Sequence, residues 1–457
     1  MSLGTEQNPL RVAIIGAGPS GFYASEALIR SDLNVEIDLI ERLPAPYGLV
    51  RSGVAPDHPK LKQAIKVYDK IASENDELNY IGNVTVGKDI TIDELKQTHH
   101  AIILTCGAET DRRLGIPGED LPGSYTATEF VAWYNGHPDY RDRSFDLSHE
   151  TAVIIGQGNV AADVSRILSK TVDELKNTDI SQHALDALAE SKIKNVYVIG
   201  RRGPAQAKFT SKELKEFGVL EDCDPIVDSK ELELNPASEA ELAEKSNAGS
   251  KKIYDLFVDY AQRKPGGRSR QCHFQFLRSP VEISGNGHVE KVTIEHNQLS
   301  GEAFKQSARG TGERYDLEAG ILFRSIGYRG IEMPGVPFHD SWGVFPNEGG
   351  RITDNDAIVP GMYTAGWIKR GPSGIIGTNR ACAVETVNAL IEDVSKLDAG
   401  NKPGRDKVYE ILNSRHVRYI NYDQWKTIDQ VEVERGEAKG KPREKITSVE
   451  EMISLVS

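Results

Sequence analysis

Two glycine-rich turns in the sequence have the spacing that binds the phosphates of a dinucleotide. The first has three glycines, Gly16, Gly18 and Gly21, and the second has Gly156, Gly158 and, in the tolerated third place, Ala161. In such a turn the first glycine permits a sharp bend, the second lets the backbone approach a pyrophosphate, and the third lets helix and strand pack closely. The free N–H groups of the following helix then face the phosphates.

The residues that end the next strand differ between the two turns. Glu41 lies 20 residues past Gly21, and its carboxylate can accept hydrogen bonds from a ribose diol and repel a 2′-phosphate. The corresponding strand after the second turn ends on Arg201 and Arg202, whose guanidinium groups suit a 2′-phosphate. We therefore assign FAD to the first turn and NADPH to the second. The structural alternatives are an empty turn and a pair of solvated arginines.

Two further segments carry residues that could act near a flavin. The loop PAPYGLVRSGVAPDHPK, residues 44–60, is rich in proline and glycine and ends on Asp57 and His58. Residues 359–383 are predicted to form a strand, a glycine-rich turn and a helix start, and Trp367 offers a flat surface there. Main-chain donors in such a turn suit a flavin ring or ribityl chain. A loop-stabilising histidine and a packed core turn are the structural alternatives.

The elements that must position these residues form two repeats of one pattern. Residues 11–41 are predicted to be strand, glycine turn, helix and strand, which is one βαβ unit, and residues 151–200 repeat the pattern with a helical insertion at about 171–192. Residues 271–285 and 288–299 alternate like antiparallel strands. We expect residues 221–270 to be surface helices and loops, and the tail after Asn401 to wrap the surface.

Composition narrows the class of protein. The chain of 457 residues is long enough for two domains, and its formal net charge of −13 argues against nucleic-acid binding and against an acidic membrane surface. We expect no integral membrane segment, because no apolar run approaches the ~20 residues that span a bilayer. The four cysteines include no CxxC pair, so we expect no cysteine-ligated iron–sulfur cluster, no metal site, and a reduced, cytoplasmic setting.

Several motifs in order resemble the adrenodoxin-reductase-type NADPH–ferredoxin reductases. They are GAGPSGFYA, PYGLVRSGVAPDHPK, IPGEDLPGS, GQGNVAADVSRIL, GRRGPAQAKFTSKEL and GWIKRGPSGIIGTN, and together they cover nearly the whole chain. The resemblance implies an α/β fold with two Rossmann-like dinucleotide-binding domains, the NADP domain being inserted into the FAD domain. We expect the FAD domain at residues 1–106 and 332–457 and the NADP domain at 107–331. The chain then passes between the two domains at the strand-like segments 101–109 and 319–330.

The resemblance also implies a set of binding residues. For FAD they are Ser20, Glu41, Leu49, Val86, Trp367, Gly374, Ile375 and Ile376. For NADPH they are Arg112, Gln157, Gly158, Asn159, Val160, Arg201, Arg202, Glu213 and Gly374. The proline-rich loop would lie along the FAD and bring His58 near the nicotinamide, where a hydrogen bond to Glu213 would help to orient that ring. We therefore predict His58 and Glu213 as the catalytic pair.

The implied reaction is reversible hydride transfer from NADPH to FAD, followed by single-electron transfer to a separate ferredoxin-type iron–sulfur protein. Two alternatives remain: the NADPH-oxidising subunit of a larger complex, and a non-catalytic flavoprotein that only binds nucleotides. Ferredoxins are usually acidic, so docking on an acidic chain needs a local basic surface. The predicted docking residues are Lys251, Lys252, Arg263, Lys264, Arg268 and Arg270, which with Asp255 and Asp259 give a net charge of +4.

Overall fold

The computed structural model describes residues 2–457 and divides them into two compact units. Unit 1 combines the chain up to Thr110 with Gly327–Ser457, and unit 2 is Asp111–Ile326. The chain therefore leaves unit 1 after Thr110 and re-enters it at Gly327, whereas the bounds predicted from the sequence lie after residues 106 and 331. A short pair of strands, β5 (Thr110–Asp111) and β15 (Tyr328–Arg329), lies at this boundary.

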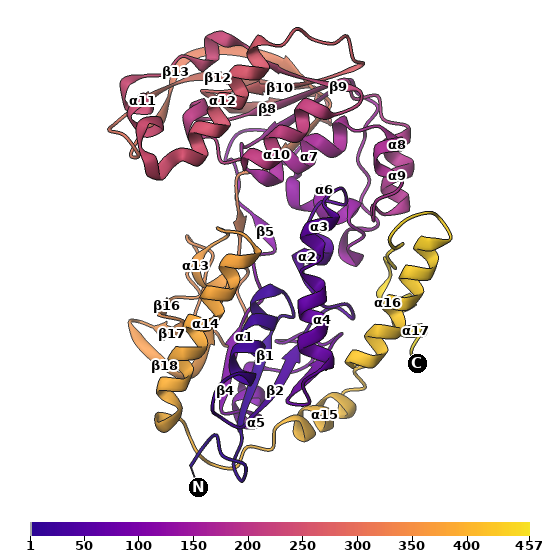
Figure 1. The fold of residues 1–457 in the computed structure, drawn as a ribbon, viewed down its shortest axis with the longest axis vertical. Coiled ribbons are helices and arrows are strands. Elements are labelled where there is room, and N and C mark those ends of the chain that lie inside the picture. Colours follow the sequence, from indigo (N-terminus) through magenta and orange to yellow (C-terminus); the bar gives the residue numbers. More distant parts are fainter. Residues whose placement is uncertain (1) are drawn as a thin grey trace. The chain divides into compact units, whose positions relative to one another are not determined.

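Unit 1 is built on a seven-stranded sheet with the order β16-β17-β18-β4-β1-β2-β3 (Figure 1). The strands β18, β4, β1, β2 and β3 run parallel, and β16 and β17 form an antiparallel edge. Their bounds are β1 Leu10–Ile15, β2 Val35–Ile40, β3 Leu78–Ile81, β4 Ala101–Leu104, β16 Asn347–Glu348, β17 Arg351–Asp354 and β18 Ala357–Thr364. The carboxyl ends of parallel strands all lie at the same end of the sheet, and ligands bind at this end in folds of this kind.

Helices cover both faces of this sheet, because alternate residues of each strand point to opposite faces. In β1, Val12 and Ile14 pack into one core, and Ala13 and Ile15 pack into the other. The helices are α1 Pro19–Ile29, α2 Leu49–Ser52, α3 Pro59–Lys62, α4 Ile65–Ser73, α5 Ile92–Thr98, α13 Trp367–Arg370, α14 Ile376–Asp393, α15 Arg405–Ser414, α16 Tyr422–Glu437 and α17 Val449–Ser454. Within residues 2–457, no helix has the length and apolar character to span a membrane.

The C-terminal tail is part of the core of unit 1, which corrects the expectation that it wraps the surface. Trp425 and Ile428 of α16 are 0% exposed and pack in the same core as β1 and α1. Val408 and Leu412 of α15 are likewise buried, in the core on the opposite face of the sheet. The charged residues that suggested a surface tail occupy the outer sides of amphipathic helices.

Unit 2 contains a six-stranded parallel sheet with the order β6-β14-β7-β8-β10-β9. Its strands are β6 Ser124–Thr126, β7 Thr151–Ile155, β8 Asn195–Ile199, β9 Cys223–Val227, β10 Arg270–Gln275 and β14 Ile321–Arg324. A separate antiparallel sheet contains β11 Arg278–Ser284, β12 Lys291–Ser300 and β13 Ser307–Glu318. Helices pack on one face of the parallel sheet, and the antiparallel sheet packs on the other.

The helices of unit 2 are α6 Ala127–Tyr134, α7 Asn159–Ser169, α8 Val172–Leu175, α9 Gln182–Ala189, α10 Ser211–Glu216, α11 Pro236–Ala243 and α12 Ala248–Gln262. Two expectations are corrected here. Residues 221–270 contain a sheet strand, β9, and a core helix, α12, whose Phe257 is 0% exposed. The segment 271–285 is not a single antiparallel strand, because β10 runs parallel to β8 and β9 and only β11 joins the antiparallel sheet.

Candidate active site

The first glycine turn of unit 1 has a backbone that excludes larger residues. Gly16 has a φ of +107°, and a Cβ there would lie 2.7 Å from the carbonyl oxygen of Thr105. A Cβ at Gly21 would lie 2.1 Å from the carbonyl oxygen of Gly16, so Gly21 lets α1 pack against the turn. Gly18 precedes α1 and provides no side-chain cap. The first N–H groups of α1 are therefore open to an anion.

Glu41 directly follows β2 and contacts the same turn. Its Oε2 accepts a hydrogen bond from the backbone N–H of Ala17 at 2.8 Å, and its Oε1 accepts one from Leu43 at 3.2 Å. Burial raises the pKa of this carboxyl above its ordinary value, and the two N–H groups oppose that shift. Each carboxylate oxygen has a further lone pair, so Glu41 can also accept hydrogen bonds from the hydroxyls of a ligand.

The proline-rich loop packs against this turn through its backbone. The N–H of Tyr47 donates to the carbonyl oxygen of Ala17 at 2.7 Å, and Tyr47 has the unusual φ of +83°. A Cβ on Gly48 would lie 3.1 Å from the Cα of Gly18, so the two glycine backbones face each other closely. Leu49 begins α2 and is 37% exposed. The loop thus forms a second wall beside the turn.

The C-terminal helix α16 holds this loop in place. Arg51 of α2 donates two hydrogen bonds to Glu432, at 2.8 and 2.5 Å, and the carboxylate side chain is 0% exposed. The indole N–H of Trp425 donates to the hydroxyl of Tyr47 at 3.3 Å. Because α16 provides the partner residue in both contacts, the conformation of the loop depends on residues about 380 positions later in the chain.

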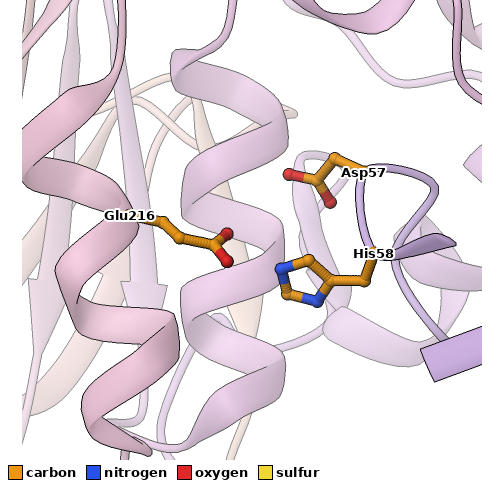
Figure 2. A group of neighbouring side chains, drawn as sticks. All are labelled: Asp57, His58 and Glu216. Carbon is orange, nitrogen blue, oxygen red and sulfur yellow. The ribbon is translucent and has the colours of Figure 1, made fainter. Parts of the chain in front are cut away.

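The loop ends at Asp57 and His58, directly before α3. The N–H of His58 donates to the carbonyl oxygen of Ala55 at 3.0 Å. Figure 2 shows the Asp57 carboxylate and the His58 ring on this loop, and it also draws Glu216, which comes from the end of α10 in unit 2. His58 belongs to unit 1 and Glu213 to unit 2, so a hydrogen bond between them stays a prediction.

The third glycine-rich segment contacts the start of α1. A Cβ at Gly366, whose φ is +81°, would lie 2.2 Å from the Oγ of Ser20. The indole Nε1 of Trp367 is buried and has no hydrogen-bond partner among residues 2–457. Gly374 has a φ of +85°, and the following Ile375 is 68% exposed directly before α14. An unpartnered buried donor and an exposed isoleucine beside a glycine turn together suit a bound ligand.

Val86 lies apart from these contacts. It is in the turn after β3, bridges to Ile90, and packs partly against the second core of unit 1. The structure therefore brings the first turn, Glu41, the proline-rich loop and the start of α13 together through described contacts, and it gives no such contact between them and Val86.

The second glycine turn, in unit 2, repeats the geometry of the first. A Cβ at Gly156, whose φ is +134°, would lie 2.1 Å from the carbonyl oxygen of Ser325. A Cβ at Gly158 would meet no atom within 4 Å, and this residue precedes α7 without a side-chain cap. Ala161 in the third place is 0% exposed. The turn therefore leaves open space at the N-terminus of α7.

The side chains that follow in this turn contact the protein itself. Gln157 donates through Nε2 to the carbonyl oxygen of Gln275 at 2.8 Å, and Asn159 accepts from the N–H of Thr210 at 2.7 Å. Val160 packs partly against the core. These bonds orient both side chains and use only Nε2 of Gln157 and Oδ1 of Asn159.

Arg201 and Arg202 follow β8 and have their backbone fixed on both sides. The carbonyl of Arg201 accepts from Asn297 Nδ2 at 3.0 Å, and that of Arg202 accepts from the N–H of Leu277 at 3.0 Å. Neither guanidinium group forms an ion pair within the part of the chain that the structure describes. Two unpaired cations on a fixed turn are suited to bind a phosphate.

Glu213, the predicted partner of His58, belongs to an ion-pair cluster in unit 2. Its Oε2 lies 3.1 Å from Nη1 of Arg166, a residue of α7 that is 0% exposed. Asp163 and Glu216 also contact Arg166, at 2.7 and 3.3 Å. The cluster holds α10 against α7 and fixes the position of Glu213. Arg112 is exposed, immediately after the boundary between the units.

Comparison with known proteins identifies the family. Residues 10–217 match the description Pyridine nucleotide-disulphide oxidoreductase. The mitochondrial NADPH:adrenodoxin oxidoreductase of Arabidopsis thaliana is 42% identical over 98% of this chain and 96% of its own. The NADPH-ferredoxin reductase FprA of Mycobacterium tuberculosis H37Rv is 42% identical over 98% of this chain and 99% of its own. The chain belongs to the NADPH:adrenodoxin and NADPH–ferredoxin reductase family.

The solved structures agree with this membership of the reductase family. The structure of Mycobacterium tuberculosis FprA in complex with NADPH has a TM-score of 0.92 and 41% identity, and the match covers 98% of this chain and 99% of that one. The fold is therefore the mixed α/β fold of two Rossmann-like domains that the sequence motifs predicted.

The described residues fit the cofactors of the reductase family. In unit 1 the open backbone at Gly18, the free lone pairs of Glu41 and the unpartnered indole N–H of Trp367 match a pyrophosphate, a ribose and a flavin ring. In unit 2 the open turn at Gly158 and the unpaired Arg202 match a dinucleotide with a 2′-phosphate.

The predicted ferredoxin-docking residues of unit 2 carry less free charge than the sequence suggested. Four of the six basic residues form ion pairs: Lys251 with Asp255, Arg263 with Asp259, Arg268 with Asp224, and Arg270 with Asp222. Including Asp222 and Asp224 lowers the local charge from +4 to +2. Lys252 and Lys264 are the two that have no ion pair within residues 2–457.

Sequence reasoning missed three sets of residues in the site. Arg166, Asp163 and Glu216 had a detectable signal, since Asp163 and Arg166 are three residues apart on a predicted helix. Asn297, which fixes the Arg201 carbonyl, had none, because it comes from a different sheet. The ion pair between Glu432 and Arg51 of the proline-rich loop could not be predicted either, because the two residues are 381 positions apart in the chain.

Proposed function

We propose that this chain is an FAD-dependent NADPH–ferredoxin reductase. It transfers a hydride from NADPH to FAD and then single electrons to a ferredoxin-type iron–sulfur protein, and the reaction is reversible. The observation that carries the proposal is the difference between the two glycine turns. In unit 1 the strand that follows the turn, β2, leads to the carboxylate of Glu41, whereas in unit 2 the corresponding strand, β8, leads to Arg201 and Arg202, which have no ion pair within residues 2–457. A chain with both arrangements has one site for a dinucleotide without a 2′-phosphate and one site for a dinucleotide that carries it.

Unit 1 is the FAD-binding domain in this proposal. The N-terminus of α1 and the backbone at Gly16, Gly18 and Gly21 bind the pyrophosphate, and Glu41 accepts the ribose hydroxyls. The other proposed FAD contacts are Ser20, Leu49, Val86, Trp367, Gly374, Ile375 and Ile376. When bound, FAD accepts electrons as a pair and releases them one at a time.

Unit 2 is the NADPH-binding domain. The N-terminus of α7 binds the pyrophosphate, and the guanidinium groups of Arg201 and Arg202 clamp the 2′-phosphate. The other proposed contacts are Arg112, Gln157, Gly158, Asn159, Val160, Glu213 and Gly374. His58 and Glu213 orient the nicotinamide. Neither residue has to transfer a proton to the migrating hydride, so their contribution is alignment.

The acceptor is a separate iron–sulfur protein, and we propose a cytoplasmic setting. The four cysteines of the chain are unpaired thiols: Cys106, Cys223, Cys272 and Cys382. Burial raises the pKa of Cys106 to about 12 and that of Cys223 to about 11, so both stay protonated and poorly reactive near neutral pH. Unpaired thiols of this kind suit a reducing compartment.

A spectroscopic and kinetic experiment tests this function. The purified chain should show a flavin spectrum that bleaches when NADPH is added and recovers when ferredoxin is added. Replacing Arg201 and Arg202 by alanine should raise KM for NADPH roughly tenfold to a hundredfold, because a lost charged hydrogen bond costs ~1.5–3 kcal/mol. Activity with NADH, which has no 2′-phosphate, should change little. Equal losses with both nucleotides would refute the clamp, and a flavin that never bleaches would refute the reductase.

A further inference from the structure

Two short helices of unit 1 present lysines and apolar side chains together to solvent. We name this set the α3–α4 lysine surface, and its members are Lys60, Leu61, Lys62, Lys66, Val67 and Lys70. Leu61 is 40% exposed and Val67 is 46% exposed. Lys66 and Lys70 are four residues apart on α4, so they are neighbours on its outer side.

The charges of this surface are mostly free. Lys60 and Lys66 form no ion pair in the described chain, and Lys70 has only an exposed contact of 3.5 Å to Glu74. Such exposed pairs contribute little and separate easily. Asp69 of α4 pairs with Lys426 of α16 at 2.7 Å. Lys60, Lys66, Lys70 and Lys426 against Glu74 and Asp69 leave a local charge of +2 on a chain whose formal net charge is −13.

We propose that the α3–α4 lysine surface docks the acidic iron–sulfur protein that takes electrons from this chain. This inference rests on the proposed function. An acidic partner is repelled by the chain as a whole, so it approaches where the local field is positive. Exposed leucine and valine among charged residues have the composition of a small, transient electron-transfer interface, with apolar contact at the centre and charge around it.

The surface is tied directly to the proposed flavin site of the same unit. The loop that packs on the first glycine turn leads into α3, because His58 and Pro59 are consecutive. Tyr68 of α4 is 0% exposed, and its ring stacks on Phe22 of α1 with centroids 5.1 Å apart. A partner on α3 and α4 is therefore positioned against the unit that holds FAD. The residues 251–270 belong to the other unit and carry mostly paired charge.

Charge reversal with matched controls tests the docking surface. The test variant is K60E/K66E. The rival variant is K252E/K264E, which reverses the two lysines without ion pairs among the docking residues predicted in unit 2. The control is K192E/K230E, which reverses two exposed lysines elsewhere in unit 2. All three change the net charge by the same amount, so the general field of the chain is held equal. Each FAD-loaded enzyme is assayed with NADPH and an acidic [2Fe–2S] ferredoxin, and with menadione as a neutral acceptor.

We expect K60E/K66E to raise KM for ferredoxin about tenfold or more at low salt, and this loss to shrink at high salt because the charges are screened. Menadione reduction should stay at the wild-type rate, and the control should keep ferredoxin kinetics within about twofold. A single variant, Leu61→Asn, should raise KM without changing the salt dependence.

Three results would overturn the inference. One is normal ferredoxin kinetics in K60E/K66E, and another is an equal loss in all three variants. The third is a loss confined to K252E/K264E, which would move the docking site to unit 2. A wild-type enzyme that reduces menadione but no ferredoxin would instead refute the proposed acceptor, and the docking surface with it.

Discussion

The buried ion pair between Arg51 and Glu432 should be the most sensitive point of the proposed FAD site. Replacing Glu432 by glutamine removes the charge that neutralises two guanidinium groups, Arg51 at 2.5–2.8 Å and Arg443 at 3.2 Å. Breaking a buried pair on one side costs about 3–5 kcal/mol, because the remaining charge stays buried without compensation. For a unit of about 240 residues, this corresponds to a fall of roughly 6–20 °C in Tm.

The assay is thermal unfolding of the full-length protein, followed by flavin fluorescence and circular dichroism, over a range of FAD concentrations. Because the pair fixes the loop on the first glycine turn, Glu432→Gln should also weaken FAD binding, and excess FAD should restore part of the lost Tm. The double variant R51M/E432M should lose much less stability than Glu432→Gln, because two apolar side chains replace the pair and Arg443 keeps its ion pair with Asp429.

A matched control comes from an ion pair that joins the same helix, α16, to α17. Arg435 pairs with Glu451 at 2.6 Å, but both side chains are more than 40% exposed. Glu451→Gln should therefore change stability by only about 0–1 kcal/mol. If Glu432→Gln is no more destabilising than Glu451→Gln, or if it leaves the dissociation constant of FAD unchanged, then α16 does not hold the loop as described.

The pH dependence of the same pair has a definite sign. Burial alone would raise the pKa of Glu432, but the charges of Arg51 and Arg443 hold that pKa below its ordinary value of 4.5. A lowered pKa in the folded state means that the carboxylate stabilises the fold above pH 4.5 and loses this contribution as the pH falls further. Below that pH the Tm of the wild type should therefore fall relative to the Tm of R51M/E432M. An unchanged difference between the two Tm values would contradict the assignment.

Three further predictions concern single residues of the two nucleotide sites. Glu41→Gln should weaken FAD binding about tenfold, since an amide gives up one acceptor to a ribose hydroxyl; titration of apoprotein with FAD measures this, and unchanged affinity would contradict it. His58→Ala should slow flavin reduction in stopped-flow traces without releasing FAD, and an unchanged rate would leave His58 a structural role. Asn297→Ala removes the hydrogen bond to the carbonyl of Arg201, so KM for NADPH should rise while kcat and the activity with NADH stay unchanged. Calorimetry should show that this variant binds 2′,5′-ADP more weakly than the wild type does, while its affinity for 5′-AMP is unchanged. An equal loss for both ligands would mean general damage to unit 2.

The local parts of the site were predictable because they depend on neighbouring residues. The first glycine turn needs a bend at Gly16 and close packing at Gly21, and both follow from a run of about ten residues. Glu41 at the end of β2 follows from the length of one βαβ unit. The position of Arg201 and Arg202 shortly after β8 follows in the same way. Each of these features lies next to a strongly apolar strand and a turn whose backbone excludes any residue larger than glycine.

The remaining features depend on contacts that a one-dimensional pattern does not contain. β10 was predicted as antiparallel because alternation gives the period of a strand but not the direction of its neighbours, β8 and β9. The tail was assigned to the surface because α16 is polar on average, although Trp425 is fully buried. Arg268 and Arg270 looked free because their partners, Asp224 and Asp222, lie outside residues 251–270.

The contact between α2 and α16 also sets an order of events during synthesis. Arg51 leaves the ribosome long before Glu432, which is 381 residues later, and at ~5–20 residues per second this interval lasts roughly 20–75 s. Unit 2 is one continuous segment, Asp111–Ile326, and can complete its fold within that interval. The first glycine turn and its loop must wait for the last helices before their positions are fixed. A nascent chain of this protein therefore exposes an unfinished flavin-binding unit for most of its translation, whereas unit 2 is already complete as a segment.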